Sequence, residues 1–382
     1  MDLIRPYSDP YDLWETNAGV AARKAYYKGK IRGLCGAAMI GALDWLFPAL
    51  SRRVAGSARR IHPITAAQLC LATHGAGAED RASEWLQIFR DIAAVAHDGE
   101  WSWGLGFPWM SKNGLYQADV PFITHTPYVM EALLHVAAYS PRQDAQVCGK
   151  MFNDTWRFLR RLRVMYDHGG CMAVSYSPEK EPRIVINAVA YAAWAYAMHY
   201  LQGLDERKKV ARNILEKLCR WVVSQQNGNG SWYYYADKSS GNFIDCFHSC
   251  FVVKNLRKVM GAVPELTSLL HTSIDCGAKY IESTFYDEKL GLCKRFSERD
   301  IKDAFLWDLY DQAEFLGLLI DEGRYTEAFG FQRAVVRQFA KEADWYCRID
   351  RLNRRWGKNF LRWGIVPWWY QESRLSGVTA RV

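Results

Sequence analysis

Residues 187–235, NAVAYAAWAYAMHYLQGLDERKKVARNILEKLCRWVVSQQNGNGSWYYY, contain the pattern that decides the fold: two different helices followed by an aromatic loop. The first part, residues 187–200, is almost entirely small and apolar, which suits an inner helix packed on all sides. The second part, residues 205–226, mixes charged and apolar residues at helical spacing, which suits an outer helix with one face in solvent. Gly203 between them favours the end of the first helix. The pattern predicts a helical hairpin with one buried and one half-exposed member.

The hairpin recurs along the chain with a period of about 60 residues, which is typical of a helical array. First helices are expected to begin near Pro63, Thr126, Ile186, Asn242, Trp307 and Leu361, and second helices near Ala78, Ser140, Asp205, Val263 and Arg324. No Pro- or Ser-rich linker and no change of composition divides the chain. We therefore expect an all-α fold, one (α/α) toroid of about six helical hairpins over residues 61–382. Residues 1–60 are expected to form an N-terminal helical segment that packs on this toroid.

Long loops connect each outer helix to the next inner helix, and many of the 16 tryptophans fall in them. These loops span residues 99–123, 168–183, 227–241, 288–306 and 344–359. In a toroid of alternating helices, all such connections emerge on the same rim. Short β-like segments, CMAVSYS and SWYYYA, lie within them. We expect the loops to converge into an aromatic cleft that binds a ligand.

The overall composition indicates a folded chain with a moderate excess of positive charge. Hydrophobic residues make up 49% of the 382 residues and charged residues 24%, which is ordinary for a globular protein. The net charge of +8 favours an anionic partner, such as an acidic polysaccharide, a phosphate-bearing lipid or a membrane surface. No run of five or more Lys and Arg occurs, so we expect no nucleic-acid partner.

The cysteines and the N-terminus bear on the cellular location. The ten Cys form no CxxC pair and fall mostly in apolar stretches, which favours reduced, buried thiols over a disulfide framework. The first residues, MDLIRPYSDPYDLW, have neither the basic region nor the apolar region of a signal peptide. Together these features predict a cytoplasmic protein.

Residues 34–50, LCGAAMIGALDWLFPAL, are apolar except for Asp44 and are flanked by basic residues on both sides. They are too short for a membrane span, which needs about 20 apolar residues, and Pro48 interrupts them. A buried core helix is the favoured interpretation. The alternative is a peripheral helix that contacts a membrane surface and associates the protein with it.

The sequence QNGNGSW at residues 226–232 matches the QxxxGxW pattern of the squalene cyclase and prenyltransferase toroids. In those proteins the Gln ends a helix and stacks on the Trp, which ties neighbouring repeats together. The resemblance therefore implies a structural role for Gln226 and Trp232 and supports the fold. Residues 99–101 form a partial second copy that lacks the Gln. The acidic DxDD motif of class II terpene cyclases is absent from the sequence, which argues against terpene cyclisation.

The sequence DCFHSC at residues 245–250 combines residue types that bind zinc with residue types that move protons. On a helix Cys246 and Cys250 share a face, whereas Asp245 and His248 lie on an adjacent one, so zinc would need a further ligand from another repeat. We therefore expect no metal and no cofactor. The favoured functional interpretation pairs the carboxylate with the imidazole at i, i+3 for acid–base catalysis near neutral pH. A capping Asp beside a satisfied core His is the structural alternative.

The sequence WDLYDQAE at residues 307–314 begins the fifth inner helix and holds two more catalytic candidates, Asp308 and Asp311. The helix dipole favours negative charge in the first turn, and this alone would explain both residues. An inner helix that begins at the floor of the cleft would also aim these carboxylates at the ligand. Capping and catalysis therefore both stay open. Asp119, and His125 at the start of an inner helix, are further candidates.

Arg362, Trp363 and Gly364 follow a run of basic residues and begin the last inner helix. A guanidinium group there suits a carboxylate or phosphate of the ligand, and a solvated basic loop is the alternative. The residues expected to bind the substrate are those of the aromatic rim together with this arginine: Trp101, Trp103, Trp109, Trp232, Tyr234, Tyr310, Arg362 and Trp363.

Several short motifs in order resemble a family of bacterial (α/α) toroid proteins that are found with polysaccharide and glycolipid biosynthesis genes. The motifs are WSWGLGFPW, GNGSWYYY, FIDCFHSCFVVKNL, WDLYDQAEFLGLL and NFLRWGIVPWWY, and the resemblance covers most of the chain from about residue 11. The family pattern resembles FID-N-FHTGF, so Asp245 and His248 match, but two cysteines replace the Asn and the Gly. At the fifth inner helix Asp308 matches and Tyr310 stands where His is usual. The resemblance implies the toroid fold and a glycan pathway rather than a reaction.

These features together predict an enzyme that acts by acid–base chemistry on an anionic or lipid-linked saccharide, as a hydrolase, lyase or epimerase. Aromatic rings would stack on the sugar, and arginine would hold its acidic group. One alternative is a non-catalytic carbohydrate-binding or assembly protein, which needs the aromatic rim but no convergent carboxylates. The other is an isoprenoid enzyme of the terpene cyclase or prenyltransferase type, which needs a deep, dry, aromatic central cavity.

Overall fold

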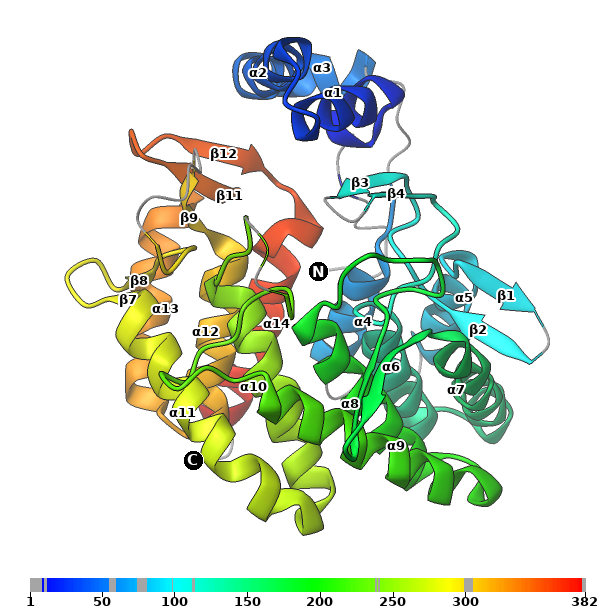
Figure 1. Cartoon of the computed structure of the whole chain (residues 1–382). Helices are drawn as coiled ribbons and strands as arrows, with labels where there is room; N and C mark the ends of the chain where they lie inside the picture. The colour runs from blue at the N-terminus through cyan, green and yellow to red at the C-terminus, as the bar shows by residue number, and fades with distance from the viewer. Residues whose placement is uncertain are drawn as a thin grey trace.

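The computed structural model describes residues 9, 12–54, 60–73, 81–97, 99–111, 114–237, 239, 241–298 and 305–379. Two layers of helices form a ring (Figure 1). The inner helices are α4 (Pro63–Ala72), α6 (Thr126–Tyr139), α8 (Ile186–Gln202), α10 (Cys246–Ala262), α12 (Leu309–Asp321) and α14 (Val366–Thr379). The outer helices are α5 (Ala82–Asp91), α7 (Arg142–Arg161), α9 (Asp205–Ser224), α11 (Thr267–Phe285) and α13 (Tyr325–Phe339). Because α14 packs against both α12 and α4, the inner ring is closed, and the predicted all-α toroid is confirmed.

The division into inner and outer helices follows the residue types. In α8, residues 186–199 are buried with the single exception of Trp194, because small side chains let neighbouring helices approach from every side. In α9, the buried residues form one stripe and the charged residues face solvent. Most helices begin within a few residues of the predicted positions. Ala78 lies outside the described residues. The start of α10 is four residues later than predicted because the Asn242 side chain instead bonds the loop backbone at Tyr235 and Asp237.

The QxxxGxW sequence links two outer helices. The Gln226 amide, just after α9, donates to the Ser273 carbonyl oxygen at 2.9 Å and accepts from the Ser273 hydroxyl at 2.7 Å in α11. The Trp232 indole donates to the Val222 carbonyl oxygen at 2.9 Å and lies against Gly277, where a Cβ atom would come within 2.5 Å of the ring. Both residues therefore have the structural role that the resemblance implies.

Every described strand lies in a connection that runs from an outer helix to the next inner helix. These are β1 (Val95–His97), β2 (Glu100–Ser102), β3 (Trp109–Ser111), β4 (Gly114–Tyr116), β5 (Val164–His168), β6 (Cys171–Val174), β7 (Tyr286–Asp287), β8 (Leu292–Cys293), β9 (Phe305–Asp308), β10 (Ala340–Lys341), β11 (Asp344–Asp350) and β12 (Arg355–Lys358). They pair antiparallel, and β9 joins β11 so that Asp308 lies opposite Arg348. CMAVSYS contributes β6, whereas SWYYYA forms only an isolated bridge between Val185 and Tyr235.

The N-terminal helices lie above the rim of the ring (Figure 1). They are η1 (Leu13–Glu15), α1 (Asn17–Tyr27), α2 (Ile31–Leu46) and α3 (Pro48–Val54), and we call residues 12–54 the cap. Trp45 of α2 stacks on Trp356 of β12 with ring centroids 5.6 Å apart. The core-helix interpretation of residues 34–50 is wrong, because α2 packs on α1 and the rim and leaves Met39 61% and Leu46 57% exposed. Among the described residues, no helix is both long enough and apolar enough to cross a bilayer.

Candidate functional site

A cavity of about 1010 Å³ lies between the cap and the rim of the ring. The cap contributes residues of α1 and α2, and the ring contributes the rim loops and the first turns of α8, α10 and α12. Seventeen of the lining residues are aromatic and six are arginines. A cavity of this size, with rings for apolar contact and a few charged groups for orientation, suits a ligand larger than a metabolite of a few atoms.

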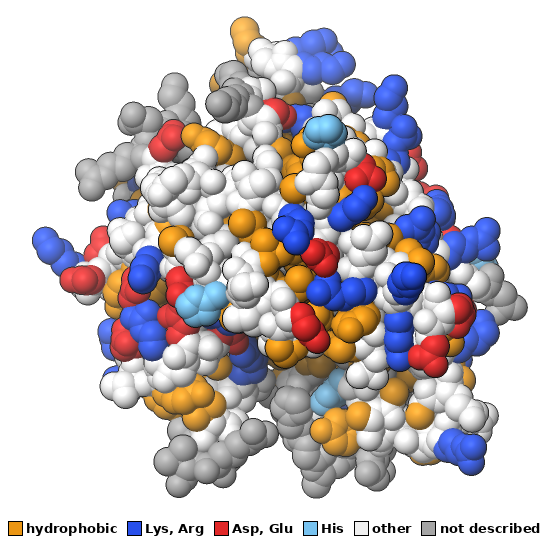
Figure 2. Space-filling view, turned by 60° about the horizontal axis from the view of Figure 1, so that its bottom comes forward, with side chains coloured by type: hydrophobic (Ala, Val, Ile, Leu, Met, Phe, Trp, Pro, Cys, Tyr) orange, Lys and Arg blue, Asp and Glu red, His pale blue; other side chains and the backbone are white. Residues whose placement is uncertain are grey.

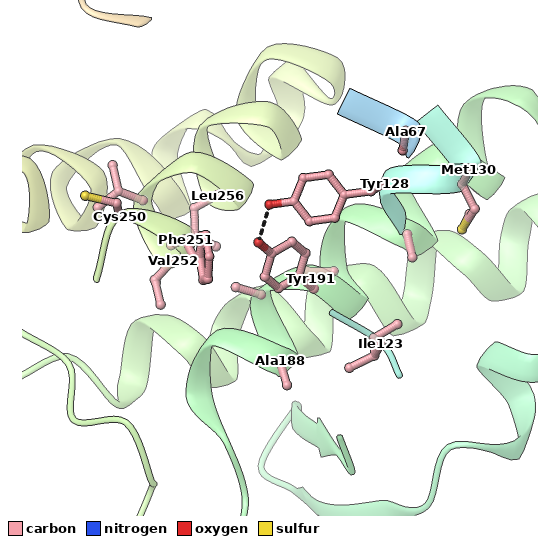
Figure 3. Close-up of a cluster of buried hydrophobic side chains, with 14 of the residues drawn as sticks. Ala67, Ile123, Tyr128, Met130, Ala188, Tyr191, Cys250, Phe251, Val252 and Leu256 are labelled. Atoms are coloured by element: carbon pink, nitrogen blue, oxygen red, sulfur yellow. Dashed lines mark hydrogen bonds between the residues drawn. The ribbon is translucent and has the colours of Figure 1, made fainter. Parts of the chain in front are cut away.

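The floor of the cavity is closed by polar side chains from the inner helices. The hydroxyl groups of Tyr128 in α6 and Tyr191 in α8 lie 2.8 Å apart (Figure 3). Lys254 of α10 donates to Glu314 of α12 at 2.7 Å and to the Tyr128 hydroxyl at 3.1 Å. Burial raises the pKa of both tyrosines well above the ordinary value, so their hydroxyls stay neutral. This network links α6, α8, α10 and α12 beneath the cavity.

A histidine held by a carboxylate stands in the wall of the cavity. Asp245 occupies the residue before α10, but its side chain does not cap the helix. Its carboxylate instead contacts His248 Nδ1 at 2.7 and 2.9 Å, as the i, i+3 spacing predicted. Asp245 is buried, whereas His248 lines the cavity with 21% of its side chain exposed. Because Nδ1 is engaged, Nε2 is the ring nitrogen available to a ligand.

Aromatic rings fix the plane of that imidazole. The ring of Phe247 lies 3.9 Å and that of Tyr234 4.4 Å from it, centroid to centroid. The neighbouring Cys246 and Cys250 are buried, and burial raises the pKa of both thiols well above the ordinary value. In the described part of the chain, no three His, Cys, Asp or Glu side chains form a group that could hold a metal ion.

Asp308 lines the cavity as the centre of an ion-pair cluster. It caps α12 by accepting the Tyr310 backbone N–H at 3.0 Å. Its Oδ2 accepts from Arg295 Nη1 at 3.0 Å and from Arg348 Nε at 2.9 Å. The carboxylate therefore has its accepting capacity largely used, which suits positioning of the two guanidinium groups better than attack on a substrate.

Asp311 lies behind the cavity wall and does not line it. It is fully buried, and its Oδ1 accepts the Phe247 backbone N–H at 2.9 Å, which joins the first turns of α10 and α12. Its Oδ2 has no hydrogen-bond partner. Burial raises the pKa of this carboxyl group well above the ordinary value, with the negative charge of Asp308 adding to the effect.

Arg362 anchors the cap to the ring. Its guanidinium group contacts Asp9 at 3.1 Å, Glu15 at 2.8 Å and Asp12, and His62 Nε2 at 3.1 Å. All of these groups are buried. Burial raises the pKa of Glu15 to about 7, although Arg362 opposes this effect.

The backbone after this arginine requires a glycine. Gly364 has φ of +127°, and a Cβ atom there would lie 2.9 Å from the backbone nitrogen of Tyr310. The close approach brings Trp363 to the cavity, where its ring centroid lies 5.9 Å from that of Trp109. The predicted Arg-Trp-Gly motif therefore joins the cap, the rim and α12.

Arg23 reaches the cavity from α1 of the cap. Its guanidinium carbon lies 3.9 Å from the ring centre of Trp109 and 5.0 Å from that of Trp14. Its Nη1 is buried without a hydrogen-bond partner. Burial lowers the pKa of Arg23, although its electrostatic interactions with Tyr27 and Asp12 oppose this effect. The unpartnered Nη1 of this guanidinium group is a donor that an anionic group of a ligand would satisfy.

The residues predicted from sequence divide into two groups. His248, Asp308, Trp109, Tyr234, Tyr310, Arg362 and Trp363 line the cavity, and so does His125, whose pKa burial lowers to about 3. The predicted residues that do not line it are Trp101, Trp103, Trp232, Asp311, the exposed Asp119 and Asp245, which lies behind His248.

The rim tryptophans outside the cavity are packing residues. The Trp103 indole is fully buried and donates to the Phe89 carbonyl oxygen at 2.8 Å, and Trp101 stacks on it with centroids 6.4 Å apart. The Trp232 indole donates to the Val222 carbonyl oxygen of α9 and packs on Gly277 of α11. Sequence reasoning missed Arg23, Arg295 and Arg348. The only signal for them is their charge, since no local motif marks them.

Comparisons with known proteins found no protein-family model and no curated protein that matches. Several solved structures share the fold. They include a GH76 α-mannanase from Bacteroides thetaiotaomicron, with 10% identity, coverage of 84% of this chain and 86% of that chain, and a TM-score of 0.58. A cellobiose 2-epimerase from Bacillus thermoamylovorans has 11% identity, coverage of 84% and 88%, and a TM-score of 0.58. A D-mannose isomerase has 12% identity, coverage of 84% and 87%, and a TM-score of 0.59. At these identities the likeness shows the toroid fold.

Proposed function

We propose that this protein is an enzyme that transfers protons at a carbon atom of an anionic saccharide, with His248 as the acid–base group. The observation that carries the proposal is the imidazole in the cavity wall, whose Nδ1 is held by the buried Asp245 carboxylate at 2.7 Å. In this arrangement Nδ1–H donates to the carboxylate, and Nε2 accepts a proton from the substrate and returns it. Epimerisation, isomerisation and β-elimination all begin with such a step.

The carboxylates of the cavity favour this chemistry over glycoside hydrolysis. Hydrolysis requires two carboxyl groups that flank the scissile bond, one as an acid and one as a base or nucleophile. Asp308 accepts from Arg295 and Arg348, Asp12 from Arg362, and Asp350 from Arg354. Three of the four carboxylates that line the cavity are thus paired to arginine, and the fourth, Asp44, belongs to the cap, so hydrolysis is the second choice among the saccharide reactions.

The substrate class follows from the rings and the arginines. Trp109, Trp363 and Tyr234 offer flat surfaces to sugar rings, and the unpaired Nη1 of Arg23 offers a donor to a carboxylate or phosphate. The six lining arginines disfavour the dry cavity of an isoprenoid enzyme. A mannanase, an epimerase and an isomerase of sugars share the fold, which supports a saccharide. An uronic acid or a lipid phosphate would supply the anion in a polysaccharide or glycolipid pathway, and the cytoplasmic location stays a prediction.

The test is exchange of a substrate hydrogen for deuterium. The protein is incubated in D₂O with disaccharides that contain an uronic acid and with hexose phosphates, and NMR follows loss of each C–H signal. We expect exchange at one carbon with the wild type and a loss of about 10²-fold or more with His248→Asn. Asp245→Asn should also slow exchange, because the imidazole loses its orientation.

The chain contains a matched control pair. His271 and Asp275 on the outer helix α11 form an exposed pair at 3.4 Å and do not line the cavity. His271→Asn should leave exchange unchanged. Equal exchange by wild type and His248→Asn would refute the proposal, and tight saccharide binding without any exchange would favour the non-catalytic carbohydrate-binding protein.

A further inference from the structure

The cap exposes more large hydrophobic side chains to solvent, for its length, than the ring does. Eleven of the 23 large hydrophobic side chains that are exposed in the described part of the chain fall within residues 26–54. They include Ile31, Met39, Leu46, Leu50 and Val54, each more than half exposed. Exposed apolar surface concentrated in this way marks a contact with another body rather than ordinary surface.

Exposed basic residues accompany that apolar surface at the end of α1 and the start of α2. The cap contains seven Lys and Arg and three acidic residues, a net charge of +4, and two of those acidic residues, Asp12 and Glu15, are buried against Arg362. Lys24, Lys28, Lys30 and Arg32 are exposed. The opposite end of the ring differs, because acidic and basic side chains are interspersed there (Figure 2). The partner of the cap is therefore apolar and anionic together, which is the chemistry of an anionic lipid surface.

The helix that carries this surface also covers the cavity. Ala37, Ala38 and Gly41 of α2 line the cavity, whereas Met39 and Leu46 do not. At 100° per residue, Met39 and Leu46 lie on the other side of the helix from this small-residue face. One side of α2 therefore faces the ligand and the other faces outward.

We propose that α2 and α3 bind the headgroup region of an anionic bilayer through this apolar and basic surface. Leu46, Leu50 and Val54 enter the acyl boundary, while Lys28 and Lys30 contact lipid phosphates. No helix is required to cross the bilayer. Docking places the cavity beneath α2 next to the membrane surface, close to a saccharide carried on a lipid phosphate. That last consequence rests on the proposed function, whereas docking itself does not.

Vesicle co-sedimentation of the full chain tests the proposal. We expect binding to phosphatidylglycerol–phosphatidylcholine vesicles, little binding to phosphatidylcholine alone, and weaker binding as salt increases. Met39→Ser with Leu46→Ser, and Lys28→Glu with Lys30→Glu, should each weaken binding by about tenfold or more. Leu201→Ser with Leu204→Ser, at exposed positions on the ring, should not.

The outcomes separate docking from the proposed function. Deuterium exchange on a water-soluble saccharide should be unchanged in the Met39→Ser, Leu46→Ser double variant, because neither residue lines the cavity. Circular dichroism checks that the variants fold. Absence of vesicle binding by the wild type, or equal binding to neutral vesicles, would overturn the proposal. Association of the wild type into dimers that the same double variant abolishes, without vesicle binding, would assign the surface to a second copy of the chain instead.

Discussion

Replacement of Arg362 by Met is expected to release the cap from the ring. Arg362 is 6% exposed at its side chain, and it is the cation shared by Asp9, Asp12 and Glu15, which are 2–7% exposed. Methionine has a similar length, so the site is filled but the three carboxylates lose their common partner. Removal of one partner from a buried ion pair costs about 3–5 kcal/mol.

At neutral pH we expect the Arg362→Met substitution to cost about 3 kcal/mol, the lower end of the range for a buried ion pair. Burial raises the pKa of Glu15 to about 7, so this carboxyl group takes up a proton readily and relieves part of the repulsion when the cation is removed. A cost of about 3 kcal/mol corresponds to a change of about 100-fold in the population of the open cap. The ring should stay folded, because its inner helices close on one another through α4 and α14 without the cap.

Hydrogen exchange read by mass spectrometry resolves the cap from the ring. Amide protection in α1 should fall by about 100-fold in Arg362→Met, while protection in α8 stays at the wild-type value. Arg374→Met is the matched control on the last inner helix, because Arg374 pairs with one partly exposed carboxylate, Asp321. It should cost about 1 kcal/mol or less. Wild-type protection of α1 in Arg362→Met would refute the assignment of Arg362 as the anchor.

Three further predictions follow from the described contacts. Burial raises the pKa of Glu15 from 4.5 to about 7, so the stability that its protonated form contributes is lost as the pH rises through 7. Urea unfolding should show the wild type losing on the order of 3 kcal/mol relative to Glu15→Gln between about pH 5 and 8. A gain of stability over the same pH range would contradict this prediction. Gln226→Ala should cost about 1–3 kcal/mol in urea unfolding because the bonds to Ser273 are lost, with deuterium exchange on the substrate unchanged. Asp311→Asn should change the free energy of unfolding by about 1 kcal/mol or less, because burial keeps the carboxyl group neutral and the bond from the Phe247 N–H remains. A large loss of turnover in this variant would show that the Asp311 carboxyl group takes part in catalysis.

Much of the fold is predictable because it follows from local patterns. The run of small residues in α8 and the charged stripe of α9 reflect burial directly, so composition separates inner from outer helices. The alternation of inner and outer helices then requires the rim loops to emerge together. The Asp245–His248 pair is predictable for the same reason, since both residues lie within one turn of one helix.

The rest of the site depends on contacts between distant segments. Trp109 and Trp103 both lie in one glycine-rich loop, but only the structure shows that one lines the cavity and the other fills the core beneath it. Asp308 and Asp311 are three residues apart, and the strand pairing of β9 with β11 decides which one meets the arginines. Arg23 becomes a site residue only because the cap folds over the mouth, more than 300 residues from Arg362 in sequence. The core-helix interpretation of residues 34–50 is wrong for the same reason. Hydrophobicity alone does not distinguish a helix buried in the protein core from a helix with an exposed apolar face.

Chemical rescue measures the central claim most directly, that His248 Nε2 moves a proton on a saccharide. His248→Ala leaves a space beside Asp245 in the cavity wall, between Phe247 and Tyr234, that free imidazole fits. Addition of imidazole should restore exchange of the substrate C–H for deuterium by about tenfold or more with saturation, and the rescue should depend on Asp245. A folded, saccharide-binding His248→Ala variant that imidazole does not rescue, or that exchanges as fast as the wild type, would contradict the account.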